Sequence, residues 1–147
     1  MLIVLVTLSV FVNRWDAARA TAATPVPAVQ YRAGQVWAIV TPPDQPDARL
    51  TVLKVDTHER LGTVVHVSIS GVELPNGSRI VPHMPLSEAA MAQTVTKLIR
   101  DDEPVTADVE GYRQWRKAVD AGKGGVFNIP VAQSFEMVRE AYSQPPR

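Results

Sequence analysis

Two alternating stretches decide the fold: Leu50-Thr51-Val52-Leu53-Lys54-Val55-Asp56-Thr57-His58-Glu59 and Gly62-Thr63-Val64-Val65-His66-Val67-Ser68-Ile69-Ser70. In both, apolar and polar residues take turns, which is the period of a β-strand with one buried face. Between them, Arg60-Leu61-Gly62 fits a three-residue hairpin loop in which Gly62 supplies the left-handed residue of a G1 bulge. The sequence therefore predicts an antiparallel hairpin.

The loop also sets the expected register, with Glu59 opposite Thr63. The pairs on the apolar face are then Thr57 with Val65, Val55 with Val67, and Leu53 with Ile69. The pairs on the other face are Lys54 with Ser68, Asp56 with His66, and His58 with Val64. A two-residue loop would set apolar residues against polar ones, so the three-residue loop is favoured.

Further elements are expected on both sides of the hairpin. Strand composition predicts a strand over residues 35–41, a hairpin or long turn over 71–81 around Asn76-Gly77, and a short strand over 126–128. Pro82-His83-Met84-Pro85 is expected to end the β region. Apolar residues at helical spacing predict helices over residues 87–100, 108–121 and from Pro130 to about Tyr142. We therefore predict an α+β fold: an antiparallel sheet of three to five strands with about three helices packed on one face.

The chain opens with an uncharged apolar run over residues 2–12, followed by an alanine-rich stretch with Ala-x-Ala sites. The run is shorter than the roughly 20 residues of a membrane span, but it has the length of the apolar core of a signal peptide. We predict a signal-like helix in residues 1–22, cleaved after Ala22, and export to the periplasm or the medium. The alternatives are an uncleaved membrane anchor formed by residues 2–12 and a first buried element of the fold. No basic residue precedes the run, which departs from the usual pattern unless Met1 is not the true start.

Residues 23–33 are rich in Ala, Pro and Thr, which predicts a linker. We expect residues 34–142 to form a single domain and residues 143–147 to form a tail. Without residues 1–22 the chain has 13 basic and 14 acidic residues. This balance argues against nucleic acid as a partner, and it leaves a membrane as a partner only through an uncleaved N-terminal segment. The chain has no cysteine, so disulfides, thiol catalysis and thiolate metal sites are excluded.

Four short motifs carry a family resemblance: Gly34-Gln35-Val36-Trp37, Val65-His66-Val67-Ser68-Ile69-Ser70-Gly71, His83-Met84-Pro85-Leu86-Ser87-Glu88 and Gly111-Tyr112-Arg113-Gln114-Trp115-Arg116. Over roughly residues 31–139 the chain resembles a family of small, uncharacterised bacterial hypothetical proteins. It departs from that pattern in a shorter segment around Asn76. The resemblance implies no activity, cofactor or site residue.

One candidate catalytic set is Asp56, His66 and Ser68, which the expected register brings together. A nucleophilic serine needs an imidazole base within hydrogen-bond reach and a carboxylate that orients the imidazole. A small hydrolase is therefore one hypothesis. The middle of a strand offers no evident oxyanion hole, however, and a polar sheet face with a cross-strand Asp-His pair needs no catalytic explanation.

The histidines His58, His66 and His83 form a candidate metal site, which makes a periplasmic metal-binding protein a further hypothesis. No two of them have the close spacing of a metal motif, so packing or hydrogen bonding is the simpler interpretation. The run Gly122-Lys123-Gly124-Gly125 lacks the preceding strand and the hydroxyl of a phosphate loop, and no cofactor is predicted.

Arg113, Arg116 and Lys117 lie on the expected outer face of the second helix and are candidate partner-binding residues. The alternative is a solvated basic face above Tyr112 and Trp115, which have the spacing of core residues. With no specific catalytic motif, the sequence favours a non-enzymatic, exported binding or interaction protein. Its partner would be another protein or a small ligand.

Overall fold

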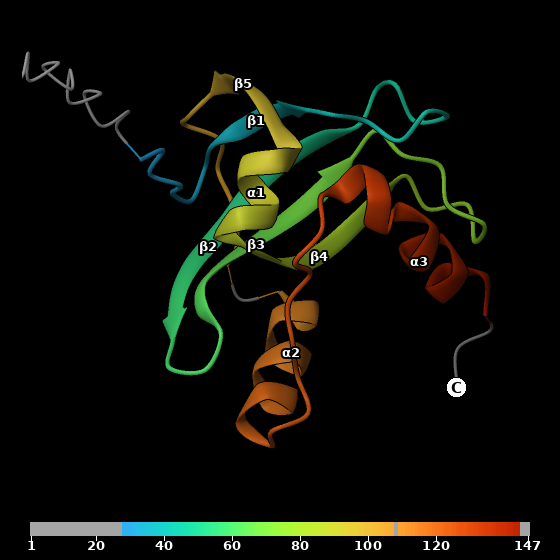
Figure 1. Cartoon of the computed structure of the whole chain (residues 1–147). Coiled ribbons are helices and arrows are strands. Elements are labelled where there is room, and N and C mark those ends of the chain that lie inside the picture. Colours follow the sequence, from blue (N-terminus) through green and yellow to red (C-terminus); the bar gives the residue numbers. More distant parts are fainter. Residues whose placement is uncertain (1–27, 108, 145–147) are drawn as a thin grey trace, which may run out of the picture.

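The fold is built around the predicted hairpin, and the computed structural model describes residues 28–107 and 109–144. The elements in chain order are β1 (Val36–Ile39), β2 (Arg49–His58), β3 (Gly62–Ser70), β4 (Ile80–Ser87), α1 (Glu88–Thr94), β5 (Val95–Arg100), α2 (Glu110–Asp120) and α3 (Val131–Ser143) (Figure 1). The five strands form one antiparallel sheet in the order β4-β3-β2-β1-β5. The predicted α+β class is therefore confirmed.

The predicted leader over residues 1–22 lies outside the described residues. Within the described ranges, none of the helices has the length and apolar character needed to cross a bilayer.

β2 and β3 form the predicted hairpin, but in a different register. The observed pairs near the loop are His58 with Gly62, Thr57 with Thr63, and Val55 with Val65. The predicted pairing of Asp56 with His66 is wrong, because Asp56 faces Val64 and Lys54 faces His66. Gly62 does adopt the predicted left-handed conformation, with φ of 70°. The alternating pattern could not exclude this register, because a shift of two residues leaves every side chain on the same face.

A bulge at Leu53 interrupts the pairing of β2 with β3. Beyond the bulge Val52 pairs with Val67 and Leu50 with Ile69, so the predicted pairing of Leu53 with Ile69 is wrong. The bulge falls where two apolar residues, Val52 and Leu53, follow each other and break the alternation. It lets Leu50 and Val52 reach the main core, where both are fully buried.

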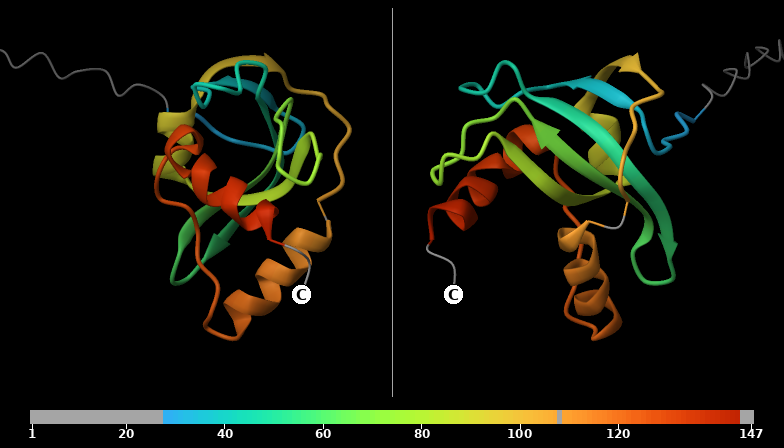
Figure 2. Two further views of the ribbon diagram at one scale, coloured as in Figure 1. Left: turned by 90° about the vertical axis from the view of Figure 1, so that its right-hand side faces the viewer. Right: turned by 180° about the vertical axis from the view of Figure 1, so that it is seen from behind.

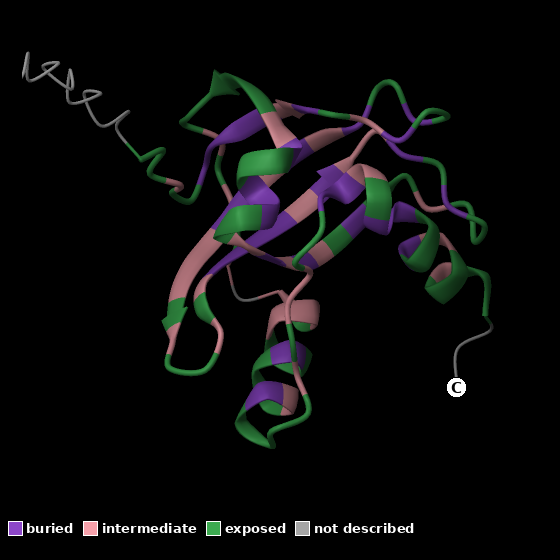
Figure 3. Ribbon diagram, in the orientation of Figure 1, coloured by how far each residue is buried: buried purple, intermediate pink, exposed green. Residues whose placement is uncertain are grey.

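The helices cover both faces of the sheet: α1 and α3 lie on one face and α2 on the other (Figure 2). Val65 of β3 belongs to the main core with Met91 of α1 and Phe135 of α3. Its neighbour Val64 points to the opposite face, in a smaller cluster with Trp115 and Val119 of α2. Buried residues accordingly follow one another along β3 (Figure 3). The expectation that all the helices share one face is thus wrong for α2.

The predicted helix over residues 87–100 is correct only in its first half. It ends at Thr94, and residues 95–100 form β5, an edge strand beside β1. The β-branched residues Val95, Thr96 and Ile99 favour the strand. Thr94 joins the end of α1 to the start of α3, because its hydroxyl donates to Ala90 O at 2.8 Å and accepts from the backbone N–H of Val131 at 3.1 Å.

The segment Pro82-His83-Met84-Pro85 does not end the β region but lies within β4. β4 is an edge strand, where a proline without an N–H is tolerated. Residues 71–79, where a hairpin or long turn is expected, form a turn region without a strand. The short strand predicted over residues 126–128 is reduced to a single parallel bridge between Phe127 and Leu86. The second and third helices are confirmed, with boundaries within two residues of those predicted.

Candidate functional site

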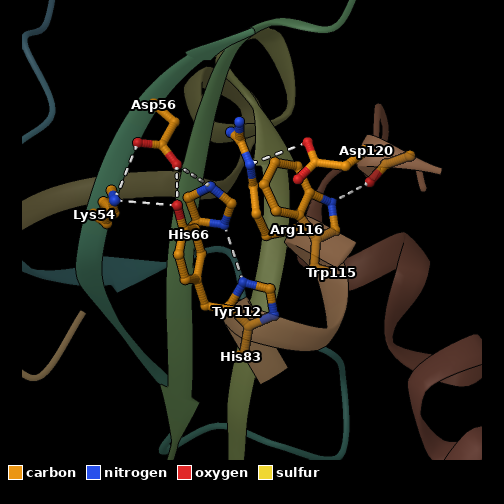
Figure 4. A network of polar contacts seen from close by, with 9 residues as sticks. Lys54, Asp56, His66, His83, Tyr112, Trp115, Arg116 and Asp120 are labelled. Carbon is orange, nitrogen blue, oxygen red and sulfur yellow. Dashed lines mark hydrogen bonds and ion pairs between the residues drawn. The ribbon is translucent and has the colours of Figure 1, made fainter. Parts of the chain in front are cut away.

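Polar and aromatic side chains from four elements converge between the hairpin and α2 (Figure 4). We call this group the Asp–His cluster; its members are Lys54 and Asp56 of β2, His66 of β3, His83 of β4, and Tyr112 and Trp115 of α2. The unbroken pairing of β2 with β3 between the loop and Lys54, and the pairing of β3 with β4, bring the strand residues to the same face of the sheet.

The Tyr112 hydroxyl lies at the centre of the polar contacts from β2. It donates to Asp56 Oδ2 at 2.8 Å and accepts from Lys54 Nζ at 3.0 Å. Lys54 Nζ also lies 3.5 Å from Asp56 Oδ1 and 4.6 Å from the centre of the Tyr112 ring. These contacts join α2 to β2 through one hydroxyl group.

His66 links this group to β4. Its Nδ1 lies 3.0 Å from Nε2 of His83, and its Nε2 lies 3.4 Å from Asp56 Oδ2 without the geometry of a hydrogen bond. A carboxylate only accepts, so a hydrogen on His66 Nε2 is the favoured arrangement. His66 Nδ1 then accepts from the Nε2–H of His83, and the Nε2–H of His66 faces the Asp56 carboxylate.

One of the two imidazoles is shielded from water, and the other, that of His83, is partly buried. His66 is completely buried, and the rings of Trp115 and Tyr112 pack edge-on against it at 4.5 and 4.9 Å between centroids. Burial lowers the pKa of His66 to about 4, although the Asp56 carboxylate acts in the opposite direction. Burial and the neighbouring His66 lower the pKa of His83 to about 4 as well. Both imidazoles are therefore neutral at pH 7.

The structure brings Asp56 and His66 together but leaves Ser68 outside their contacts. Ser68 pairs with Thr51 beyond the bulge, and on the same strand face it lies about 7 Å from His66 along β3. It lines a separate hollow with Thr51 and Leu53. A general base must reach the proton it abstracts, and a fully buried imidazole is closed to a substrate. This geometry counts against the hydrolase hypothesis.

Of the candidate metal ligands, His66 and His83 are adjacent and His58 is not. His58 lies at the hairpin end, where its Nδ1 accepts from the backbone N–H of Arg60 at 3.2 Å. It is four residues from Lys54, the partner of His66, which corresponds to about 13 Å along β2. Among the described residues, no group of three or more His, Cys, Asp or Glu side chains could hold a metal ion.

The basic residues of α2 are exposed, as expected for an outer face. Two of them contact acidic residues of the same helix: Arg113 contacts Glu110 at 2.6 Å, and Arg116 contacts Asp120 at 3.2 Å. Lys117 is also exposed. The face therefore carries both signs of charge, which does not favour an acidic partner in particular.

Gly111 allows α2 to approach the cluster. A Cβ at this position would lie 2.6 Å from Cβ of His83, closer than real side chains come. His83, Tyr112 and Trp115 were not expected to join His66, because they come from β4 and α2, far from the hairpin in the chain. Gly111 beside Tyr112 is the one sequence signal of this close approach.

A second candidate site is a hollow of about 510 Å³ beside α1. Its lining residues come from the segment before β1, from β1, from α1 and from the start of β5: Ala28, Val29, Tyr31, Trp37, Glu88, Ala89, Ala92, Val95 and Thr96. We call it the α1 hollow. The lining is largely apolar, with the rings of Tyr31 and Trp37 edge-to-face at 6.0 Å between centroids. The sequence did not predict this hollow, because it placed Tyr31 in a linker and Val95 and Thr96 in a helix, so that these residues were not expected to lie together.

Comparison with family models, curated proteins and solved structures finds no match for this chain.

Proposed function

We propose that the protein is a non-enzymatic binding protein that takes a small ligand in the α1 hollow. The observation that carries the proposal is the hollow itself, because its volume of about 510 Å³ lies within the usual range for small-molecule sites of roughly 300–1,000 Å³. Its lining also has the expected character, with an apolar surface, two aromatic rings and a few polar groups.

The Asp–His cluster has a structural role in this proposal. Its hydrogen bonds and ring contacts join α2 to the hairpin, and the burial of His66 removes the imidazole from any substrate. The predicted leader over residues 1–22 supports an exported location, and we include export in the proposal. The mature protein would then begin at Ala23, which mass spectrometry of protein recovered from the cell envelope or medium can check.

Ligand binding can be tested by following backbone amide signals in NMR during titration with small neutral alcohols, such as benzyl alcohol and 3,3-dimethylbutan-1-ol. We expect saturable shifts at Tyr31, Trp37 and Val95, and none at Trp115 on the other face of the sheet.

A substitution that fills the hollow provides the matched comparison. Ala92→Phe places a ring in the α1 hollow and should abolish the shifts, whereas Gln93→Phe alters an exposed neighbour on α1 that is not part of the lining. The proposal fails if neither the alcohols nor the cation tested below produces saturable shifts, or if Ala92→Phe binds as well as Gln93→Phe.

A further inference from the structure

Glu88 gives the α1 hollow a negative charge. In the part of the chain that the structure describes, it is the only charged residue of the lining and has no ion-pair partner. Among the described residues, no lysine or arginine lines the hollow. Burial, and secondly the Glu88 charge, raise the pKa of Tyr31, which agrees with a carboxylate near that hydroxyl. The hollow would therefore attract a cation and repel an anion.

The Trp37 ring and the segment that carries Tyr31 are held by Gln35, a buried residue just before β1. Its Oε1 accepts from the indole Nε1–H of Trp37 at 3.2 Å and from the backbone N–H of Arg32 at 3.1 Å. Its side-chain amide donates to the backbone carbonyl of Gln30 at 3.2 Å. One side chain thus fixes both the Trp37 ring and the chain segment that carries Tyr31.

The rings of Tyr31 and Trp37 meet edge-to-face at 66°, and both line the hollow, Tyr31 being half-buried and Trp37 8% exposed. The faces of Tyr and Trp rings attract ammonium groups, and paired aromatic walls are the usual recognition element for alkylated ammonium. A carboxylate on the same hollow supplies the opposite charge. These two features are independent of each other and favour the same ligand chemistry.

We infer that the α1 hollow binds an organic cation with an alkylated ammonium group, held by Glu88 and by the rings of Tyr31 and Trp37. The inference rests on the proposed function and names the ligand class of the same site.

The experiment compares choline with 3,3-dimethylbutan-1-ol, which has the same shape with a carbon in place of the charged nitrogen. Binding to the purified protein is measured by NMR titration at low salt. We expect choline to bind about tenfold more tightly than the alcohol, the combined effect of one partly exposed ion pair and one cation–π contact. Added salt should reduce this difference.

Glu88→Gln should reduce the preference for choline from about tenfold to about threefold, because the cation–π contact remains, and should leave the affinity for the alcohol unchanged. Glu59→Gln, at the hairpin end and outside the hollow, is the matched control and should bind both as the wild type does. Tyr31→Phe keeps the ring and should retain the preference for choline, whereas Tyr31→Leu should reduce it.

The outcomes separate the inference from the proposed function. If both probes bind the wild type equally, or if Glu88→Gln keeps the full preference for choline, the inferred ligand class is wrong and the hollow remains a site for neutral ligands. If neither probe binds, the proposed function fails as well.

Discussion

Tyr112 is the residue through which α2 and β2 share their hydrogen bonds. Its hydroxyl donates to Asp56 Oδ2 and accepts from Lys54 Nζ, and its ring packs on His66. The side chain of Asp56 is only 16% exposed, so water has limited access to the carboxylate if the hydroxyl is removed. A buried acceptor that loses its donor costs more than the average hydrogen bond contributes.

The substitution Tyr112→Phe tests this role at the level of a single atom. We expect it to lower the free energy of unfolding by about 1–3 kcal/mol, because Asp56 loses its donor while the ring contacts remain. Urea denaturation monitored by circular dichroism measures the change. Tyr142→Phe is the control, because no hydrogen bond of the Tyr142 hydroxyl is found among the described residues. An equal loss of unfolding free energy in the two variants would contradict the role assigned to Tyr112.

α2 is the element whose position depends on close approach rather than on the main core. It packs through Trp115 and Val119 against Val64, and the indole N–H of Trp115 donates to Gly125 O at 2.7 Å. The run Gly122–Gly125 turns the chain back so that this carbonyl comes within reach, with Gly122 at a φ of 74°. The N-terminal end of α2 lies over His83 only because residue 111 has no side chain.

Gly111→Ala therefore tests whether close packing against His83 outweighs the gain in helix propensity. In an exposed helix this change stabilises by about 1 kcal/mol, but here the added Cβ would meet His83 Cβ at 2.6 Å. We expect a net loss of about 1–3 kcal/mol, the usual cost of overpacking, with increased exposure of Trp115 seen by fluorescence. Gly125→Ala is the control, because its added Cβ meets no atom within 4 Å, and it should leave the free energy of unfolding almost unchanged. A Gly111→Ala protein that is more stable than the wild type would show that α2 is not tightly docked.

At the scale of the whole molecule, the sheet is covered on both faces, and the smaller of its two cores contains the pair of imidazoles. The charged and titratable groups around the pair are Asp56 and Lys54 of β2 and Tyr112 of α2. Burial holds the pKa of both histidines at about 4 in the folded protein, against about 6.5 in the unfolded chain. Between these values the unfolded chain binds more protons than the folded one.

The sign of the pH dependence follows from this difference. The stability supplied by the neutral pair is fully present above pH 6.5 and is lost as the pH falls from about 6.5 towards 4. The free energy of unfolding falls by at most about 1.4 kcal/mol per pH unit for each proton that the unfolded chain binds in excess of the folded one. Urea denaturation at pH 7, 6 and 5 checks the slope, and His83→Gln should reduce it while keeping a donor for His66. A free energy of unfolding that is constant between pH 7 and 5 would contradict neutral, buried imidazoles.

Much of the fold follows from local pattern. The alternation over residues 50–70 specifies a hairpin, and Gly62 supplies its left-handed residue. The stripe of Tyr112, Trp115 and Val119 specifies α2 and its buried side, and the spacing of Val131, Phe135 and Val138 specifies α3. These features depend on the period of a single element, which the sequence carries in full.

The candidate sites depend on contacts that no local pattern contains. A register two residues from the predicted one sets Lys54, rather than Asp56, opposite His66. Pairing with β1 at the edge of the sheet makes residues 95–100 the strand β5 rather than the second half of a helix.

The sequence by itself determined the α+β class, the hairpin, two of the helices and the absence of thiol chemistry. Only the tertiary structure decided that His66 pairs with His83, that Ser68 stands apart, and that Tyr31, Trp37 and Glu88 share a hollow. The physical reason is that periodicity reports which side of an element is buried, whereas the partner on that side is selected by packing between segments far apart in the chain.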